Sequence, residues 1–451
     1  MNLRRELSIL WMAGGRWFSD MGTILIRDGA VLTGGGWVEP GYVWVEAGRI
    51  TAVSTTPPSP NILAQADEII DAQYCAVMPG LVNAHTHLSQ TFMRGLAGGR
   101  PLLPWLKERI WPLQAAFTPD DARLAAQLGL VENLRGGVTH VVNHHKVAAS
   151  PAHTDAVCET AVASGLHVTI ARSWTDKGVN AEPAAAILAD LARLFARWQG
   201  AERLHIASGP LALWRCSADT LRRSHELARR YGSFTHFHVA ESQDEVQLSL
   251  NEWGMRPVAW LHDIGMLAAD TQVVHAVWVD EDEIRLLAQT GAPVVHCPVS
   301  NAVLGSGIAP VAALMQQGVP VKLGTDGPAS NDTQDMWETM KTAVAFARAS
   351  TLDATVLPPA AALNMALSAD ALHPGAPADL IVVNLNHARA MPVHDVASAL
   401  ALSTRGSDVQ TVIVGGQILL RDGQVVGLDE AALLAECRRA VAALRQRAGL
   451  Q

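Results

Sequence analysis

The sequence has few of the features that mark disulfide-bonded, nucleic-acid-binding or membrane proteins. Its five cysteines are odd in number, scattered and without a C-x-x-C pair, which argues against a disulfide framework and favours a reducing compartment. Charged residues make up only 17% of the chain, and 34 basic against 43 acidic residues leave a net charge of −9. This mildly acidic balance lacks the basic footprint of a nucleic-acid-binding protein and offers no Lys/Arg run for an anionic membrane. No apolar stretch is long enough to span a bilayer.

The length and the hydrophobic content of the chain indicate a large folded protein. The 451 residues are 49% hydrophobic, which excludes a disordered chain and supports a sizeable buried core. Residues 1–20 contain a short apolar run, but Glu6 and Arg16 interrupt the pattern of a signal peptide and no cleavage site stands out. We therefore interpret residues 1–20 as an N-terminal extension and expect a cytoplasmic protein.

Both ends of the chain are rich in short β-type segments separated by turns. This pattern extends over residues 21–77 and occurs again over residues 375–425. Asp-Gly at 422–423 is typical of a hairpin turn. We expect the two segments to combine into one small β-sandwich domain. Residues 426–451 carry the amphipathic pattern of a closing C-terminal helix.

The middle of the chain, residues 78–374, alternates apolar strand candidates with Ala/Leu/Arg-rich helical stretches. The strand candidates are GLVNAH, VTHVVNH, LHVTIAR, LHIASG, FTHFHVAE, TQVVHAV, APVVHCP and PVKLGTD. About eight such units predict an α/β fold, a TIM-like (β/α)8 barrel, with a doubly wound open sheet as the rival.

Polar residues follow these strands at the end where barrel enzymes place their catalytic groups. His85 and His87 are two positions apart in an extended segment, so their imidazoles point to the same side. His238 and Asp326 end two later strand candidates, and His275 and His296 end others. Each has a structural alternative when taken alone: a hydrogen-bonded histidine, or an N-cap or turn for the aspartate. Three histidines and one aspartate together suit one divalent cation, Zn²⁺ or Fe²⁺.

A second, bridged metal ion is not expected. Two metal ions that share a site usually need a further ligand between them. The fourth strand candidate, LHIASGP, offers neither lysine nor glutamate for that role.

Five segments together resemble one enzyme family. They are PGLVNAHTHL, FHVAES, VVHAV, HCPVSN and KLGTDGPASND, and they resemble the cytosine deaminase/chlorohydrolase-like branch of the amidohydrolase superfamily. The resemblance extends over residues 21–425 and implies a metal-dependent barrel that hydrolyses C–N or C–Cl bonds on heterocycles. It implies that the metal ligands are His85, His87, His238 and Asp326. It also implies that His275 contacts the attacking water and the substrate, and that Glu241 shuttles protons.

These roles agree with the chemistry of the residue types. A bound metal lowers the pKa of water enough for attack at neutral pH, and Asp326 would accept the proton of that water. Glu241 would protonate the ring nitrogen beside the attacked carbon, a transfer worth roughly 10²–10⁴ in rate. His275 would hydrogen-bond to the developing tetrahedral centre before ammonia leaves.

Candidate substrate contacts come from three places. Gln90 and Arg94 follow the first histidine pair, His144 and His145 end the second strand candidate, and Trp214 follows the fourth. Glutamine and arginine offer donors and acceptors for ring atoms, and tryptophan offers a flat face for stacking.

The substrate prediction rests on the resemblance alone. HTHLSQ with a following RG, the strand-end NHH and HCPVSN look most like the members that deaminate oxidised guanine, which implies conversion of 8-oxoguanine and water to uric acid and ammonia. Adenosine-type deaminases tend to carry acidic residues after RG, where this chain has residues 97–100, AGGR. Guanine, isocytosine, cytosine, adenosine-type nucleosides and chlorotriazines stay open as alternatives.

Other classes are disfavoured. An inactive scaffold would typically have lost a metal ligand, and none is missing. The H-x-E…P-C-x-x-C signature of nucleic-acid base deaminases, the G-x-S-x-G of α/β-hydrolases and a convincing G-x-G-x-x-G are absent from the sequence. We expect a small heterocyclic substrate, no nucleic-acid or membrane partner, and a homodimer, the commonest oligomer of soluble enzymes.

Overall fold

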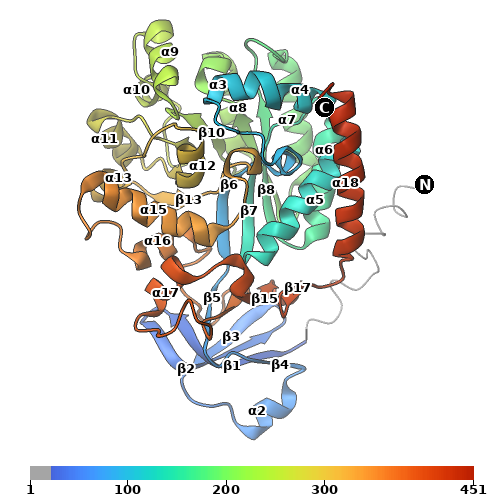
Figure 1. Ribbon diagram of the computed structural model, residues 1–451, viewed down its shortest axis with the longest axis vertical. Helices are drawn as coiled ribbons and strands as arrows, with labels where there is room; N and C mark the ends of the chain where they lie inside the picture. The colour runs from blue at the N-terminus through green and yellow to red at the C-terminus, as the bar shows by residue number, and fades with distance from the viewer. Residues whose placement is uncertain (1–21, 451) are drawn as a thin grey trace.

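The computed structural model describes residues 22–450, which form a barrel with a sheet domain packed against one end (Figure 1). The extension expected over residues 1–20 lies outside the described part of the chain. None of the helices within residues 22–450 is long and apolar enough to cross a bilayer.

Eight parallel strands form the barrel in sequence order, each hydrogen-bonded to the next. They are β6 (Leu81–Thr86), β7 (Val138–His145), β8 (His167–Trp174), β9 (Leu204–Pro210), β10 (Thr235–Val239), β11 (Thr271–His275), β12 (Val294–His296) and β13 (Val321–Leu323). The N–H of Asp326, just past β13, donates to the carbonyl of His85 in β6 at 2.9 Å, so the last strand returns to the first. The predicted (β/α)8 barrel is confirmed, and each strand candidate contains or overlaps one of these strands.

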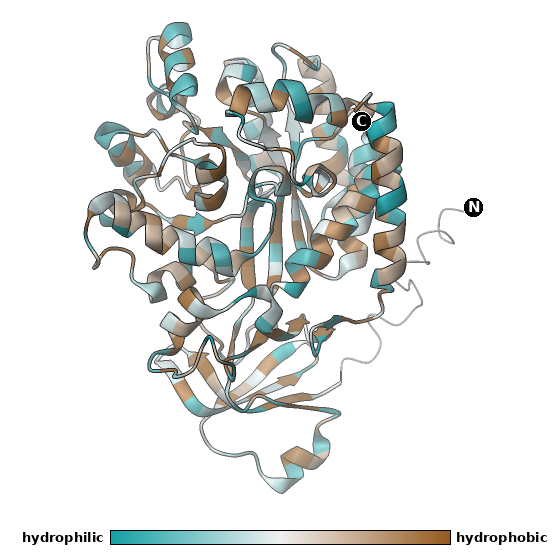
Figure 2. Cartoon of the chain, in the orientation of Figure 1, coloured by the Kyte–Doolittle hydropathy of each residue, from teal (hydrophilic) through white to brown (hydrophobic). Residues whose placement is uncertain are grey.

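Helices surround the barrel because their apolar faces bury against its strands. In α7, for example, the buried residues are Ile187, Leu191, Leu194 and Phe195, which share one face of a 3.6-residue period. Figure 2 shows hydrophobic residues along the barrel strands and hydrophilic ones on the outer faces of the helices. The α-helices are α2 (Pro60–Gln65), α3 (Leu102–Trp105), α4 (Trp111–Ala116), α5 (Pro119–Arg135), α6 (Pro151–Ser164), α7 (Ala184–Trp198), α8 (Ala218–Arg230), α9 (Gln243–Trp253), α10 (Pro257–Asp263), α11 (Glu281–Thr290), α12 (Pro298–Val303), α13 (Val311–Gln316), α14 (Pro328–Asn331), α15 (Met336–Thr351), α16 (Pro359–Ala366), α17 (Val396–Ser403) and α18 (Glu430–Arg447). Short turns of other helix types lie at η1 (Leu88–Met93), η2 (Leu106–Ile110), η3 (Leu213–Arg215) and η4 (Gly406–Asp408).

The remaining strands form one nine-stranded sheet from both chain ends. From the N-terminal side come β1 (Ile24–Thr33), β2 (Gly36–Glu46), β3 (Arg49–Ser54), β4 (Glu68–Asp71) and β5 (Cys75–Pro79), and from the C-terminal side β14 (Leu380–Asn384), β15 (Val409–Val414), β16 (Gln417–Arg421) and β17 (Gln424–Val425). The two sets join where β14 pairs antiparallel with β5. Residues such as Val31, Val43 and Val382 give this sheet a hydrophobic core of its own. The small domain predicted from both chain ends is therefore present.

The C-terminal helix α18 closes the outside of the barrel along α5 (Figure 1). It buries Leu433, Cys437 and Leu444, and Arg447 in its last turn pairs with Asp121 in the first turn of α5.

Candidate active site

The four predicted metal ligands converge at the carboxyl end of the barrel. One donor atom from each of His85, His87, His238 and Asp326 lies within 4.8 Å of all the others, and all four residues are buried. Asp326 Oδ1 lies 3.0 Å from His87 Nε2 and 3.3 Å from His85 Nε2, and the Nε2 atoms of His87 and His238 are 3.4 Å apart. Segments separated by more than 200 residues thus aim nitrogen and oxygen donors at one point.

Backbone carbonyls set the tautomers of two of these histidines. The Nδ1–H of His87 donates to the carbonyl of His144 at 2.8 Å, and that of His238 donates to the carbonyl of Leu211 at 2.6 Å. A carbonyl oxygen only accepts, so both imidazoles carry their proton on Nδ1. Their Nε2 lone pairs are therefore directed into the cluster, as metal ligation requires.

A second pair of side chains orients His85. The amide oxygen of Gln272 accepts from Nδ1–H of His236 at 2.8 Å, and His236 Nε2 lies 2.7 Å from His85 Nδ1, from which it accepts. His85 Nε2 is then left buried with no hydrogen-bond partner among the described residues. An orphaned buried nitrogen beside a carboxylate fits a metal ligand. The sequence places His236 on the same strand face as His238 but does not indicate this supporting role.

The carboxylate of Asp326 is held by two hydroxyl groups. Its Oδ2 accepts from Ser300 Oγ at 2.6 Å and from Ser330 Oγ at 3.1 Å, which leaves Oδ1 toward the histidines. Burial alone raises the pKa of Asp326, but the imidazoles of His85 and His87 hold that pKa well below its usual range. The group is therefore an ionised acceptor at neutral pH.

The histidines are neutral because they are buried. Desolvation lowers the pKa of His87 to about 4 and holds the pKa of His85 and of His238 well below the usual value. Neutral imidazoles and an ionised carboxylate are the protonation states that bind a metal. Three nitrogens and one oxygen fit a divalent cation of borderline softness.

Glu241 and His275 stand beside this cluster. Glu241 Oε2 lies 3.6 Å from His275 Nε2, and Glu241 Oε1 has no hydrogen-bond partner within residues 22–450. The Nδ1–H of His275 donates to Asn301 Oδ1 at 2.9 Å, which turns Nε2 toward the site. Burial, reinforced by the negative charge of Asp326, raises the pKa of Glu241 to about 8. Glu241 is therefore a buried acid at neutral pH.

Several of these side chains are presented by strained backbone. His275 has φ of 75° and Asp326 has φ of 60°, and Ala240, next to Glu241, has φ of 53°. Non-glycine residues rarely adopt the left-handed region, and such strain concentrates at functional sites. The three positions lie at or just after the ends of β10, β11 and β13. The left-handed backbone there changes the direction of the chain where each strand ends, beside the converging side chains.

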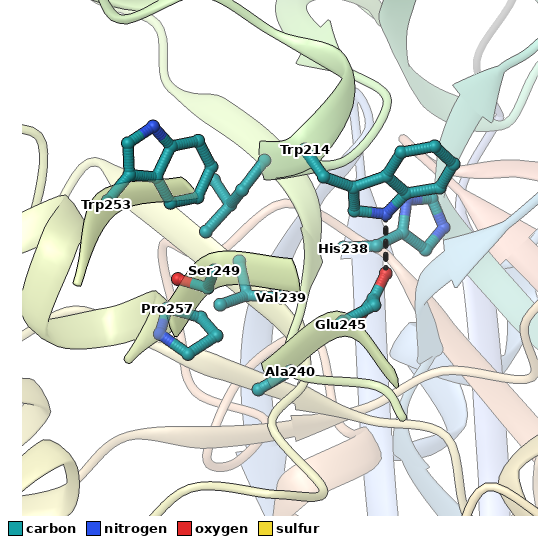
Figure 3. Close-up of a pocket in the computed structure, with 9 residues that line it drawn as sticks. Trp214, His238, Val239, Ala240, Glu245, Ser249, Trp253 and Pro257 are labelled. Atoms are coloured by element: carbon teal, nitrogen blue, oxygen red, sulfur yellow. Dashed lines mark hydrogen bonds between the residues drawn. The ribbon is translucent and has the colours of Figure 1, made fainter. Parts of the chain in front are cut away.

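Glu245, on α9, supports Glu241 and was not predicted from the sequence. Its Oε2 accepts from the N–H of Glu241 at 2.7 Å, and its Oε1 accepts from Trp214 Nε1 at 3.3 Å (Figure 3). Burial and the nearby Glu241 raise the pKa of Glu245 to about 7. Trp214 and His238 line one small cavity of about 10 Å³, which has room for roughly one water molecule. Trp214 thus lies near His238, with its indole N–H donating to Glu245.

Two other residues predicted to contact the substrate, Gln90 and His144, lie close to the converging side chains. Gln90 is buried against Gly327, where an added Cβ would lie 1.8 Å from Gln90 Oε1, so only glycine fits beside Asp326. The ring of His144 lies 4.8 Å from that of His238, and its Nε2 donates to the carbonyl of Gly209 at 3.1 Å.

Arg94 and His145 are not brought to the metal ligands. Arg94 is partly exposed and pairs with the carboxylate of Glu132. His145 alternates with His144 along β7. Burial, together with the charges of Arg172 and His153, lowers the pKa of His145 to about 3. An alternating strand sends neighbouring side chains to opposite faces, so the two histidines cannot both face the site.

A cavity of about 390 Å³ opens beside the cluster, at the ends of β7, β8 and β9. Its lining includes Gln114, Lys146, Ser173, Trp174, Asn180 and Leu211. Leu211 holds His238 through its carbonyl, and the charge of Lys146 acts on Asp326 and Glu241, so the cavity adjoins the site. Burial lowers the pKa of Lys146. This volume falls within the range of small-molecule sites, and Lys146 is a lining residue that sequence reasoning missed because no motif marks it.

Comparison with known proteins gives relatives along almost the whole chain. A 5-methylthioadenosine/S-adenosylhomocysteine deaminase of Halobacterium salinarum is 37% identical over 415 residues, which cover 89% of this chain and 93% of the relative. A 5'-deoxyadenosine deaminase of Methanothrix thermoacetophila is 35% identical over 427 residues, covering 92% of this chain and 98% of the relative.

Solved structures share the fold. A zinc-bound adenosine deaminase from Xanthomonas campestris superposes with a TM-score of 0.87 and 31% identity over 94% of this chain and 98% of that chain. A triazine hydrolase from Arthobacter aurescens superposes with a TM-score of 0.85 over 93% of this chain and 99% of that chain, but its 23% identity is evidence for the fold alone.

A family model described as "Amidohydrolase family" matches residues 76–419, which include every residue of the cluster. The barrel, the four converging donors and the long relatives agree with this match. The chain is a hydrolase and belongs to the amidohydrolase family.

Proposed function

We propose that the chain is a metal-dependent hydrolytic deaminase that acts on the adenine ring of an adenosine-type nucleoside. The observation that carries the deaminase assignment is Glu241, a buried acid with a pKa of about 8 beside His275 and the metal ligands. Loss of an amino group from a ring needs an acid that protonates the ring, and we assign this role to Glu241.

The substrate class follows from the relatives. The two curated relatives described above, at 35% and 37% identity, are named as deaminases of adenosine derivatives. The 8-oxoguanine substrate predicted from the sequence has no support among them, and they favour the adenosine-type alternative. The short motifs at the strand ends perform chemistry common to the whole branch, so they distinguish these substrates poorly.

The chemistry begins with water activation. His85, His87, His238 and Asp326 would hold a divalent cation, which supplies Lewis acidity that lowers the pKa of water from 15.7 to about 7. We propose Zn²⁺, because the 31% identical neighbour carries zinc and three imidazoles suit that ion. Asp326 takes the proton of the attacking water, since its depressed pKa keeps it ionised and its Oδ1 faces the centre.

Glu241 and His275 complete the reaction on the ring. Water oxygen bonds to the carbon that carries the amino group, and Glu241 donates its proton to the adjacent ring nitrogen. The Nε2 of His275 hydrogen-bonds to the new oxygen, because Asn301 fixes the opposite nitrogen of the imidazole. The proton held by Asp326 passes to the amino group, and the proton of the new hydroxyl group returns to Glu241. The C–N bond breaks, and ammonia leaves a ring carbonyl.

The cavity of about 390 Å³ supplies room beyond the purine ring. Its polar lining residues Gln114, Ser173 and Asn180 offer donors and acceptors to the hydroxyl groups of a sugar. This supports a nucleoside over a free base.

The test is ammonia release by zinc-loaded protein. The panel compares 5'-deoxyadenosine, 5'-methylthioadenosine, S-adenosylhomocysteine, adenosine, adenine, 8-oxoguanine, guanine, cytosine and a chlorotriazine. We expect the highest kcat/KM with one of the adenosine derivatives, little turnover of adenine, and loss of activity after chelation that zinc restores. A preference for 8-oxoguanine, or chloride release without ammonia release, would refute the proposal.

A further inference from the structure

A second group of metal-binding side chains lies at the opposite end of the barrel. His140 and His167 stand near the amino ends of β7 and β8, and Asp379 directly precedes β14 of the sheet domain. One donor atom from each lies within 4.8 Å of the other two. We propose that these residues, here called the floor cluster, bind a divalent transition-metal ion that links the barrel to the sheet domain.

The hydrogen bonds around the floor cluster leave donor atoms free. His140 Nδ1 lies 2.9 Å from Thr139 Oγ1, and one carboxylate oxygen of Asp379 accepts from the N–H of Gly415 at 2.7 Å. These two hydrogen bonds do not use His140 Nε2 or Asp379 Oδ2, and Asp379 Oδ2 lies 3.1 Å from His167 Nε2. Ligands held through their opposite atom are the usual arrangement around a protein-bound metal.

The contact between His167 and Asp379 is short enough for an ion pair, and two ligands of one ion would lie at a similar distance. His167 Nε2 lies 3.1 Å from Asp379 Oδ2, yet within residues 22–450 this nitrogen has no aligned hydrogen-bond partner. The same arrangement occurs in the active site, where His85 Nε2 lies 3.3 Å from Asp326 Oδ1 without a hydrogen bond. In both places a nitrogen and an oxygen approach closely but are not aimed at one another.

The imidazoles are in register and close together. His140 pairs with His167 across β7 and β8, and their rings stack at 4.3 Å between centroids with 7° between planes. Burial, together with the neighbouring His167, lowers the pKa of His140 to about 4, so its lone pair is available at neutral pH. His205, on the neighbouring strand β9, is exposed and close enough for its charge to act on His140.

The ion that fits is one that prefers imidazole over oxygen alone, such as Zn²⁺ or Co²⁺. The side chains of His167 and Asp379 are 20% and 12% exposed, so an ion can enter from solvent. Because the ligands come from both domains, a bound ion would stabilise the folded chain by linkage. The proposal is independent of the deaminase reaction.

The test is a Co²⁺ titration of the full-length, chelator-stripped protein. Bound cobalt is counted by elemental analysis after gel filtration, and its geometry is followed by visible absorption. We expect two ions per chain in the wild type and one in the His140→Gln/His167→Gln variant. His373→Gln, which changes an exposed histidine outside both clusters, is the matched control and keeps two ions.

A complementary variant isolates the floor cluster. His85→Ala/His238→Ala removes two ligands of the active site, abolishes activity, and is expected to retain one Co²⁺ that also raises its Tm. One ion per wild-type chain, two ions in the His140→Gln/His167→Gln variant, or no ion in the His85→Ala/His238→Ala variant would overturn the proposal. If the His140→Gln/His167→Gln variant does not fold, the His85→Ala/His238→Ala titration decides alone.

Discussion

Glu241 is the side chain on which the proposed reaction depends most directly. Replacing it by glutamine keeps its size but removes the proton that the ring nitrogen receives. We expect Glu241→Gln to lower kcat by about 10²–10⁴ with unchanged bound metal, because general-acid transfer is worth that much. Steady-state kinetics with metal analysis checks this, and Glu226→Gln, on the exposed face of α8, is the control. Near-normal turnover in Glu241→Gln would exclude the acid role.

Glu245 makes the stability of the protein depend on pH. Its pKa in the folded protein is raised to about 7, above its ordinary value, because it is buried next to Glu241. A raised carboxyl pKa contributes stability that is fully present below the unfolded pKa and is lost as pH rises through the folded pKa. Glu245→Gln cannot ionise, so its Tm relative to the wild type should increase between pH 4.5 and pH 8. Thermal unfolding at several pH values measures this difference, and a constant difference would contradict it.

The convergence of the four predicted metal ligands could be anticipated because each ends or directly follows an apolar strand. His85, His87, His238 and Asp326 lie where the barrel must place functional groups, so strand pattern and residue type are sufficient. The supporting residues were not predictable in the same way. His236, Glu245 and Lys146 acquire their roles from contacts with side chains distant in sequence, and no spacing rule encodes those contacts. For His145 the substrate contact stays a prediction, and strand alternation directs its side chain away from that of His144.

At the scale of elements, helix α5 depends on how its first turn is capped. Thr118 Oγ1 accepts from the N–H of Asp121, and the Asp121 carboxylate accepts from the N–H of Thr118, a reciprocal capping box. Arg447 of α18 binds the same carboxylate. We expect Thr118→Ala to cost about 1 kcal/mol in the free energy of unfolding. Urea denaturation measures this loss, and Ser59→Ala, which uncaps the exposed helix α2, should change it by much less.

The elements themselves were predictable to different degrees. The barrel strands are apolar runs between turn signals, so all eight were found, and the pairing of both chain ends followed from their shared β-type pattern. The joining of β5 to β14 in one sheet, and the short helices α12, α13 and α14, depend on tertiary packing that local periodicity does not contain. Substrate choice is less predictable still, because the cavity beside the site is lined by residues from several loops.

For the whole molecule, the reactivity of the five cysteines measures how well the native fold excludes reagents from its interior. All are free and buried, and burial raises the pKa of Cys75 and of Cys437 to about 11. A thiol reacts as its thiolate, so both burial and the raised pKa protect these groups. We expect a disulfide reagent at pH 8 to modify fewer than about one cysteine per chain in the native protein and all five in urea.

The rate of that reaction carries further information, because buried thiols react only when the structure opens. Cys437 packs between α18 and α5, whereas Cys158 lies on α6 and Cys216 follows η3. A ligand that stabilises the fold should slow the modification of all three buried thiols. Mass spectrometry of each cysteine during the reaction shows whether α18 opens together with the barrel or separately from it. Common slowing by zinc would show that the barrel and α18 open as one unit, whereas rapid modification of Cys437 alone would show that α18 detaches independently.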